Sequence, residues 1–493
     1  MFLFGHDPLL YPTLSAGLQA FVRTAYGILL LLTLTAALPQ ARRYFRSERW
    51  GGFAQSSAWV DAVQNPYVAP WLLALWIASA LGLVFDTFVV AAAGINLLLC
   101  HYFFIRMRWR GVLRGMGAPG FIAFWLGAAV LVLELTARHA PALRGLALLT
   151  VQVDFACIMV SAGLYKLVSG YRTGSGMQLG MVNPEWGYWP GFWRNWPSNH
   201  PLFHFLNEMA WSTELFAGLL MLLPPTRMIG AFAILASFVF IATQIRLGFL
   251  CEMVMVCCLL FVPAGGAVDG ALAAMAPGRG LEAGVPLPGS VQIALAWCLW
   301  AYVFVLPLAR AGMFYNQLAH KRLPALIQSA LDRYANLTGL IIWRVFTADV
   351  VDFFVRVWAQ PSAGGGRRLI SDYEGFTWTH RFRQVAECIA VTSVFTTLRY
   401  YPSRRGIFTE RLLRYARTIP HAADERLVFE WVAVVGQPDR FAFVSVAEYT
   451  TDVTSGHVGE VVLSNAVSVH APAPASPVHE GAGPGTYAPL EPS

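Results

Sequence analysis

Long apolar runs dominate the first 310 residues of the chain. A helix needs about 20 apolar residues to cross a hydrocarbon core roughly 30 Å thick. We therefore expect an α-helical polytopic membrane protein, with a transmembrane bundle of about nine spans over residues 1–310. Their approximate bounds are 18–38, 69–85, 87–105, 121–137, 145–167, 208–224, 228–245, 247–263 and 290–309.

Two pairs of these segments are separated by short breaks. Only Asp86 divides the second segment from the third, and a charge at the bilayer midplane is costly. We therefore expect Asp86 at the tip of a tight helical hairpin. Arg246 marks the only turn available between the seventh and eighth segments. The first run is too long for a signal peptide and ends without a small-residue cleavage site, so we expect it to remain as a span.

Basic residues are distributed unevenly between the two sides of the predicted bundle. If the amino terminus lies outside, one side receives twelve of them and the other side four. The positive-inside rule assigns the richer side, and with it the C-terminal third of the chain, to the cytoplasm. The twelve are Arg42, Arg43, Arg46, Arg49, Arg106, Arg108, Arg110, Arg114, Lys166, Arg172, Arg194 and Arg246, and the four are Arg138, Arg144, Arg227 and Arg279.

The hydropathy pattern changes after the bundle. Residues 311–384 show helical periodicity and then a glycine-rich linker, and they predict interfacial helices on the membrane surface. Residues 385–470 alternate apolar and polar positions, which predicts a small β-rich extramembrane domain. Residues 471–493 predict a disordered tail. Strands are expected at Cys388–Arg399, Leu427–Val435, Phe441–Tyr449 and Val458–Val469, and the aromatic residues assigned to the interfacial helices include Phe353, Phe354 and Trp358.

The composition favours a protein that lies mostly in lipid. The 493 residues are 56% apolar and only 13% charged, whereas a soluble protein carries about 25% charged residues. The net charge of +7 comes from arginines beside apolar runs, which is typical of membrane-edge anchors and not of a nucleic-acid-binding stripe. The seven cysteines have no paired spacing, so we expect neither a disulfide framework nor a zinc site.

Three acidic residues, Asp154, Glu214 and Glu252, lie inside predicted spans. An intramembrane acid is a functional-site hypothesis by default. These acids either form a polar site that binds or processes a ligand, or they close structural ion pairs within the bundle. The basic residues available as ion-pair partners are Lys166, Arg227 and Arg246.

A second candidate site precedes the sixth span. A helix that begins at Pro201 places His204 and Glu208 on one face, with His200 near its cap. Such a face supplies metal ligands or an acid–base pair. The alternative is an interfacial helix, where His and Trp suit the headgroup region. No third strong ligand lies nearby, so we predict no metal. The Trp-rich loop at residues 169–200, which precedes this helix, is expected to cover the bundle or to contact lipid or a partner.

Three sequence motifs resemble the membrane core shared by the lipase maturation factors and the vitamin K-dependent gamma-glutamyl carboxylases. These motifs are SAGLYKL at 161–167, TELFAGLLMLLPPTRMIG at 213–230 and LGFLCEMVMV at 247–256. The Arg-rich segment RRYFRSERWGGF after the first span is also similar to that superfamily. The resemblance covers about the first 310 residues and implies a bacterial relative that resides in the inner (cell) membrane.

The resemblance also gives Lys166 a chemical role. It matches the lysine that acts as a base on the quinol cofactor of the carboxylases. The carboxylases place a histidine about ten residues before the position of Leu247, and this chain has Phe238 there. The absence of that histidine argues against carboxylase chemistry. The soluble part of that family lies on the luminal side. The arginine count places the C-terminal part of this chain in the cytoplasm, and we keep the prediction from the arginine count.

These features favour an integral membrane accessory subunit, or a maturation or assembly factor, that binds a partner protein and membrane lipids. The alternative is a membrane enzyme that uses Lys166 as a base on a lipid-soluble or peptide substrate, and no cofactor is identified. If Lys166 is structural, its partner must come from another segment, because Asp154 lies about 18 Å away along one helix. The nearest acids are Glu185, Glu208 and Glu214.

Overall fold

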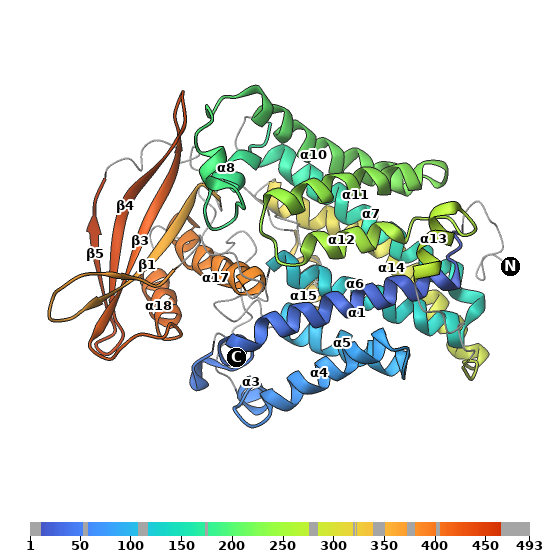
Figure 1. Ribbon diagram of the computed structural model, residues 1–493. Coiled ribbons are helices and arrows are strands. Elements are labelled where there is room, and N and C mark those ends of the chain that lie inside the picture. Colours follow the sequence, from blue (N-terminus) through green and yellow to red (C-terminus); the bar gives the residue numbers. More distant parts are fainter. Residues whose placement is uncertain are drawn as a thin grey trace.

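The computed structural model describes residues 11–52, 58–106, 117–172, 176–275, 284–318, 321, 323–338, 351–371, 380–400 and 405–464. Within these residues the chain forms a bundle of helices followed by an antiparallel sheet at one end of the bundle (Figure 1). The predicted combination of an apolar helical bundle and a C-terminal β-rich region is therefore confirmed. The predicted tail, residues 471–493, lies outside the described residues.

Every predicted span corresponds to a helix in the bundle. Among the described residues, five helical stretches are long and apolar enough to cross a membrane, namely Ala16–Tyr44, Ala118–His139, Pro141–Val168, Pro224–Gln244 and Gly289–Asn316. Three of the remaining predicted spans are shorter apolar helices, and the fourth, α10, carries two glutamates. The nine helices are α1 (Ala16–Ala37), α4 (Ala69–Val84), α5 (Val89–Cys100), α6 (Gly117–His139), α7 (Arg144–Val168), α10 (Pro201–Leu222), α11 (Arg227–Gln244), α12 (Leu250–Leu259) and α14 (Gly289–Leu318).

The outward side chains of the bundle are apolar. Only 17% of the most apolar window of α14 is buried inside the protein. Its outer face exposes Phe304 and Leu308, and α11 exposes Phe232 in the same way. Water-soluble proteins rarely expose apolar surface of this extent. Hydrocarbon is as apolar as these side chains, so the surface suits a lipid environment.

The predicted hairpin at Asp86 is confirmed. Asp86 lies between α4 and α5 in the left-handed backbone region, with φ +57°. Its carboxylate Oδ1 lies 3.0 Å from Arg23 Nη1 and 2.8 Å from Arg138 Nη2. Arg138 Nε also lies 3.0 Å from Glu134 Oε2. The acid is thus compensated by arginines from α1 and α6.

The five strands form one antiparallel sheet in the order β2-β1-β3-β4-β5. Two predicted strands, Leu427–Val435 and Phe441–Tyr449, are confirmed as parts of β3 and β4. The third, Val458–Val469, is confirmed for the residues it shares with β5. The strands are β1 (Phe353–Pro361), β2 (Arg368–Leu369), β3 (Glu425–Gly436), β4 (Phe441–Asp452) and β5 (His457–Val462).

The predicted strand at Cys388–Arg399 is wrong. These residues belong to helix α17 (His380–Tyr400), which packs with α18 (Arg405–Ala416) between the sheet and the bundle (Figure 1). The buried side chains of Cys388, Val391 and Phe395 recur at helical spacing. Phe395 lies 5.7 Å from the ring of Tyr449 on β4, measured between ring centroids. The helix therefore supplies one layer of the core under the sheet.

The assignment of Phe353, Phe354 and Trp358 to an interfacial helix is also wrong, because all three lie in β1. Val355, Val357 and Ala359 are buried, whereas the residues between them are partly exposed. This alternation is the period of a strand with one face in the core. Between α14 and β1, the described residues contain one further helix, α15 (Ala325–Thr338).

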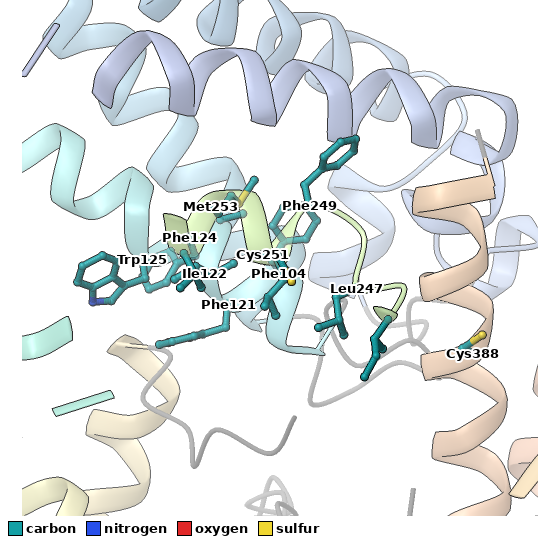
Figure 2. Close-up of a cluster of buried hydrophobic side chains, with 14 of the residues drawn as sticks. Phe104, Phe121, Ile122, Phe124, Trp125, Leu247, Phe249, Cys251, Met253 and Cys388 are labelled. Carbon is teal, nitrogen blue, oxygen red and sulfur yellow. The ribbon is translucent and has the colours of Figure 1, made fainter. Parts of the chain in front are cut away.

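The apolar core runs without a break from the bundle to the layer under the sheet. Figure 2 shows Phe121, Phe124 and Trp125 of α6 beside Met253 of α12. The cluster continues through Leu247 and Phe249 toward Cys388 on α17 (Figure 2). Bundle and sheet are thus parts of one packed body.

The Trp-rich loop joins the bundle to the sheet. It contains the short helices α8 (Met177–Val182) and α9 (Pro190–Trp193). Asn183 Nδ2 donates to the carbonyl oxygens of Val351 (2.8 Å) and Phe353 (2.7 Å), at the start of β1. Further along the loop, the backbone N–H of Ser198 donates to the carbonyl of Gln437 at 3.2 Å. The loop was expected to cover the bundle or contact lipid or a partner; it contacts the chain's own sheet.

Charged residues after α1 make a second connection to the layer under the sheet. Arg43 forms an ion pair with Glu387 of α17. The Tyr415 hydroxyl donates to Glu387 Oε2 at 2.8 Å, and burial together with this carboxylate raises the pKa of Tyr415 well above its usual value. Arg414 of α18 lies 3.6 Å from Glu48, measured between Nε and Oε2. This second connection consists of ion pairs and a hydrogen bond to a carboxylate, whereas the Trp-rich loop contacts the sheet through hydrogen bonds to backbone carbonyl oxygens.

Candidate functional site

The two motifs SAGLYKL and TELFAGLL meet at the crossing of α7 and α10. Gly163 of α7 lies so close to α10 that a Cβ there would stand 2.4 Å from the backbone nitrogen of Leu215. Gly218 of α10 is equally confined, because its Cβ would stand 2.7 Å from the backbone nitrogen of Val160. The motifs therefore contain the glycines that let the two helix backbones touch.

Lys166 and Glu214 form a buried ion pair at this crossing. Lys166 Nζ lies 2.6 Å from Glu214 Oε1, and the two side chains are 2% and 1% exposed. The ammonium also lies 5.6 Å from the centroid of the Tyr171 ring. The prediction that a structural Lys166 pairs with an acid from the following loop or span, and not with Asp154, is confirmed. Glu214 Oε2 is buried and has no hydrogen-bond partner in the part of the chain that the structure describes.

A layer of neutral polar residues lies two turns before Glu214 on the same face of α10. The fully buried Asn207 accepts a hydrogen bond from the backbone N–H of Met177 at 2.8 Å. Its Nδ2 donates to Gln178 Oε1 at 2.8 Å, which fixes α8 against α10. Sequence reasoning missed Asn207, although its seven-residue spacing from Glu214 places both on one helix face.

Asp154 belongs to a separate cluster. Its carboxylate accepts from Arg310 Nη2 of α14 at 3.0 Å, from the Tyr302 hydroxyl at 2.7 Å and from Trp125 Nε1 at 2.9 Å. The partner Arg310 was not among the three basic residues predicted for the acids. The only sequence signal for it is a lone arginine at the end of the last apolar run.

The structure places the other predicted residues of the intramembrane group apart from both clusters. Glu252 lies in the first turn of α12. Arg246 Nη1 donates to the carbonyl of Pro184 at 3.2 Å, and the guanidinium lies 5.4 Å from the centroid of the Tyr188 ring. Arg246 therefore holds the Trp-rich loop. Arg227 begins α11 and makes no ion pair with a residue that the structure describes.

His200, His204 and Glu208 do not converge on a common point. The predicted helix start at Pro201 is confirmed, and His200 Nδ1 accepts from the N–H of Leu202 at 3.2 Å as the cap. His204 is exposed, while Glu208 Oε2 accepts from Trp211 Nε1 at 2.9 Å. Among the described residues, no three His, Cys, Asp or Glu side chains are placed to hold a metal ion. The geometry favours the interfacial alternative.

The fold and these contacts define a mostly helical protein with five candidate membrane spans, buried ion pairs and a C-terminal five-stranded sheet. No family model, no curated protein and no solved structure matches the chain. The resemblance to the lipase maturation factors and the carboxylases stays a prediction from the quoted motifs.

Proposed function

We propose that the chain is an integral membrane accessory subunit, or a maturation or assembly factor, that holds a partner protein. The observation that carries the proposal is the closed Lys166–Glu214 pair. A general base needs a lone pair directed at the proton it takes. An ammonium 2.6 Å from a buried carboxylate is directed at Glu214 instead. Lys166 then serves to join α7 to α10.

The sheet offers the surface for the partner. One face is covered by α17 and α18, while β5 is an edge strand of the sheet formed by the described residues (Figure 1). Val461 and Val462 on this edge are exposed. An edge strand with exposed apolar side chains favours the addition of an extended segment from another protein. This arrangement supports a role of the sheet in binding a partner.

The proposed location is the inner membrane of a bacterium, with the nine helices within the bilayer and the sheet in the cytoplasm. The short helices α4, α5 and α12 belong with the five long ones in this proposal. The arginine asymmetry supports the cytoplasmic side for the end that carries the sheet.

Purification of the full-length protein in mild detergent tests the proposal. We expect a partner protein to remain with the wild type in fixed stoichiometry. Lys166→Met leaves Glu214 buried without its countercharge and should release the partner as the α7–α10 crossing loosens. The double variant Lys166→Met with Glu214→Leu restores neutrality and should recover association. Lys321→Met, at an exposed position, is the matched control. A wild type that purifies without any protein partner contradicts the proposal.

The membrane-enzyme alternative has one observation in its favour. The Glu214 oxygen that lacks a partner among the described residues, Oε2, is a buried acceptor beside the Lys166 amine. An enzyme with Lys166 as a base on a lipid-soluble or peptide substrate uses both groups. In that case the double variant stays inactive even though it is folded, whereas an accessory subunit regains its function.

A further inference from the structure

Among the residues that the structure describes, the Asp154 cluster contains more buried donors than acceptors. Both oxygens of the Asp154 carboxylate already accept hydrogen bonds, from Arg310, Tyr302 and Trp125. Arg310 itself is buried, with a side chain 7% exposed. Its Nη2 donates to Asp154, but its Nε is buried and has no acceptor among the residues that the structure describes.

A second unused donor lies in the same cluster. The hydroxyl oxygen of Tyr334 on α15 is buried and also lacks a partner within the described ranges. Tyr334 lies close enough to Asp154 and Arg310 to interact electrostatically with both. Burial and the Asp154 charge raise the pKa of Tyr334 to about 12, so the hydroxyl keeps its proton and stays a donor at neutral pH. Two buried donors in one cluster that lack acceptors among the described residues are unfavourable, and they point to a ligand that supplies an acceptor.

Charge and surroundings define the chemistry of that ligand. Asp154 and Arg310 neutralise each other, so an anionic ligand would leave an uncompensated buried charge. An uncharged acceptor such as a carbonyl oxygen avoids this penalty. Apolar side chains adjoin the cluster, because Leu306, Ala309 and Leu331 pack together with Tyr302 and Tyr334 around them. The body of the ligand must therefore be apolar.

Access comes from the side of α14. The outer face of this helix exposes the apolar side chains of Phe304 and Leu308, which lie within the two turns before Arg310. A molecule dissolved in lipid reaches this face without crossing water. We propose that Arg310 and Tyr334 hydrogen-bond the carbonyl oxygen of a lipid-soluble molecule seated between α14 and α15. This site is separate from the Lys166–Glu214 pair and does not depend on the proposed function.

The test uses the full-length protein in detergent and two probes, dioctanoylglycerol with isotopically labelled ester carbonyls and a short-chain benzoquinone. We expect one of them to bind with its carbonyl stretching frequency lowered by hydrogen bonding. Tyr334→Phe removes only a hydroxyl, and it should weaken binding roughly tenfold and reverse part of the frequency shift. Arg310→Lys keeps the positive charge but lacks the Nε donor, and it should have a similar effect.

Tyr315→Phe is the matched control, because Tyr315 is exposed on α14 and should leave binding unchanged. The probe that binds identifies the source of the carbonyl, a glycerolipid ester or a ring ketone. Binding of neither probe to the wild type overturns the proposal. Equal binding and an equal frequency shift in Tyr334→Phe and the wild type also overturn the proposal. This variant leaves both members of the Asp154–Arg310 pair in place, so that pair is not disturbed by the test.

Discussion

Buried ion pairs hold charged residues inside the bundle, among them Lys166–Glu214, Asp154–Arg310 and Arg23–Asp86. Taking two charges out of water is expensive, so such pairs contribute little net stability. Removing one partner is different, because the remaining charge is buried alone. The main effect of these pairs is therefore to specify which helices pack together, and their net contribution to the free energy of unfolding is small.

The Lys166–Glu214 pair gives the first prediction. Lys166→Met should lower the free energy of unfolding by about 3–5 kcal/mol, the usual cost of an uncompensated buried charge. The double variant with Glu214→Leu should lose clearly less. Thermal unfolding in detergent measures both values. Equal losses in the single and double variants would show that the cost comes from packing and not from charge.

The second prediction concerns Glu48, which lies just beyond the first span. Burial is the main cause that raises the pKa of Glu48 above its ordinary value of 4.5, and the nearby Arg414 opposes this shift. A raised folded-state pKa means that the protein binds the proton more tightly when folded. The contribution of this group to stability is therefore complete below about pH 4.5 and is lost as the pH rises through the raised value.

Melting temperatures of the wild type and Glu48→Gln across pH 4–7 check this sign. The variant should lack the part of the pH dependence that Glu48 causes and should be relatively more stable toward pH 7. Asp439→Asn, at an exposed position, is the control and should follow the wild type. A Glu48→Gln profile parallel to that of the wild type would refute the assignment.

Single residues were predictable from the sequence only where helix geometry alone decides. The twelve residues between Asp154 and Lys166 exclude a pair within one straight helix, and this points to an acid from the next segments. The partner of Asp154 was not predictable in this way. Arg310 contacts Asp154 because of the orientation in which α14 packs against α7. The hydrophobic periodicity of the sequence does not determine that orientation.

At the scale of elements, the α7–α10 crossing depends on two glycines. Gly163→Ala or Gly218→Ala should destabilise the protein by about 1–3 kcal/mol, because each new methyl group meets backbone atoms of the other helix. Gly94→Ala on α5 is the matched control, since nothing lies within 4 Å of its Cβ position. In an open helical position alanine is the better helix former, so the control should be neutral or slightly stabilising. Unfolding measurements that rank the control with the other two variants contradict the packing account.

The apolar helices were predictable because long runs near spanning length leave few alternatives. The two wrong predictions, a strand at 388–399 and a helix that includes Phe353 and Phe354, fall where residue propensity and hydrophobic periodicity favour different secondary structures. Residues 388–399 are rich in β-branched side chains, but Cys388, Val391 and Phe395 follow a helical period, and packing under the sheet decided the outcome. In β1, the two adjacent aromatic residues concealed the alternation of Val355 and Val357.

On the scale of the whole molecule, the Arg-rich segment after α1 and the sheet lie at the same end of the bundle. The Arg43–Glu387 and Glu48–Arg414 contacts establish this. The loop after α12 lies at the other end, where Asp269 on α13 (Ala267–Met275) bonds Ser15 at the start of α1 (Figure 1). Which end faces the cytoplasm stays a prediction from the arginine count.

Single-cysteine labelling tests that orientation. After removal of the native cysteines, Ser455→Cys in the β4–β5 turn should resist a membrane-impermeant reagent in intact cells and react after lysis. Ala264→Cys, exposed after α12, should react in intact cells. The reversed pattern would place the sheet outside and leave the fold unchanged. Both positions are exposed, so a difference between them reports sidedness and not burial.

The Trp-rich loop has a mechanical consequence. It is the covalent link between α7 and α10, and it is also hydrogen-bonded to the start of β1 at Asn183 and to the β3–β4 connection at Ser198. Two separate attachment points restrict rotation of the sheet relative to the loop, which a single point would allow. We therefore expect a force on the outer edge of the sheet to be transmitted to α7 and α10, the helices that carry Lys166 and Glu214. Rotation between the sheet and the bundle would not relieve that force.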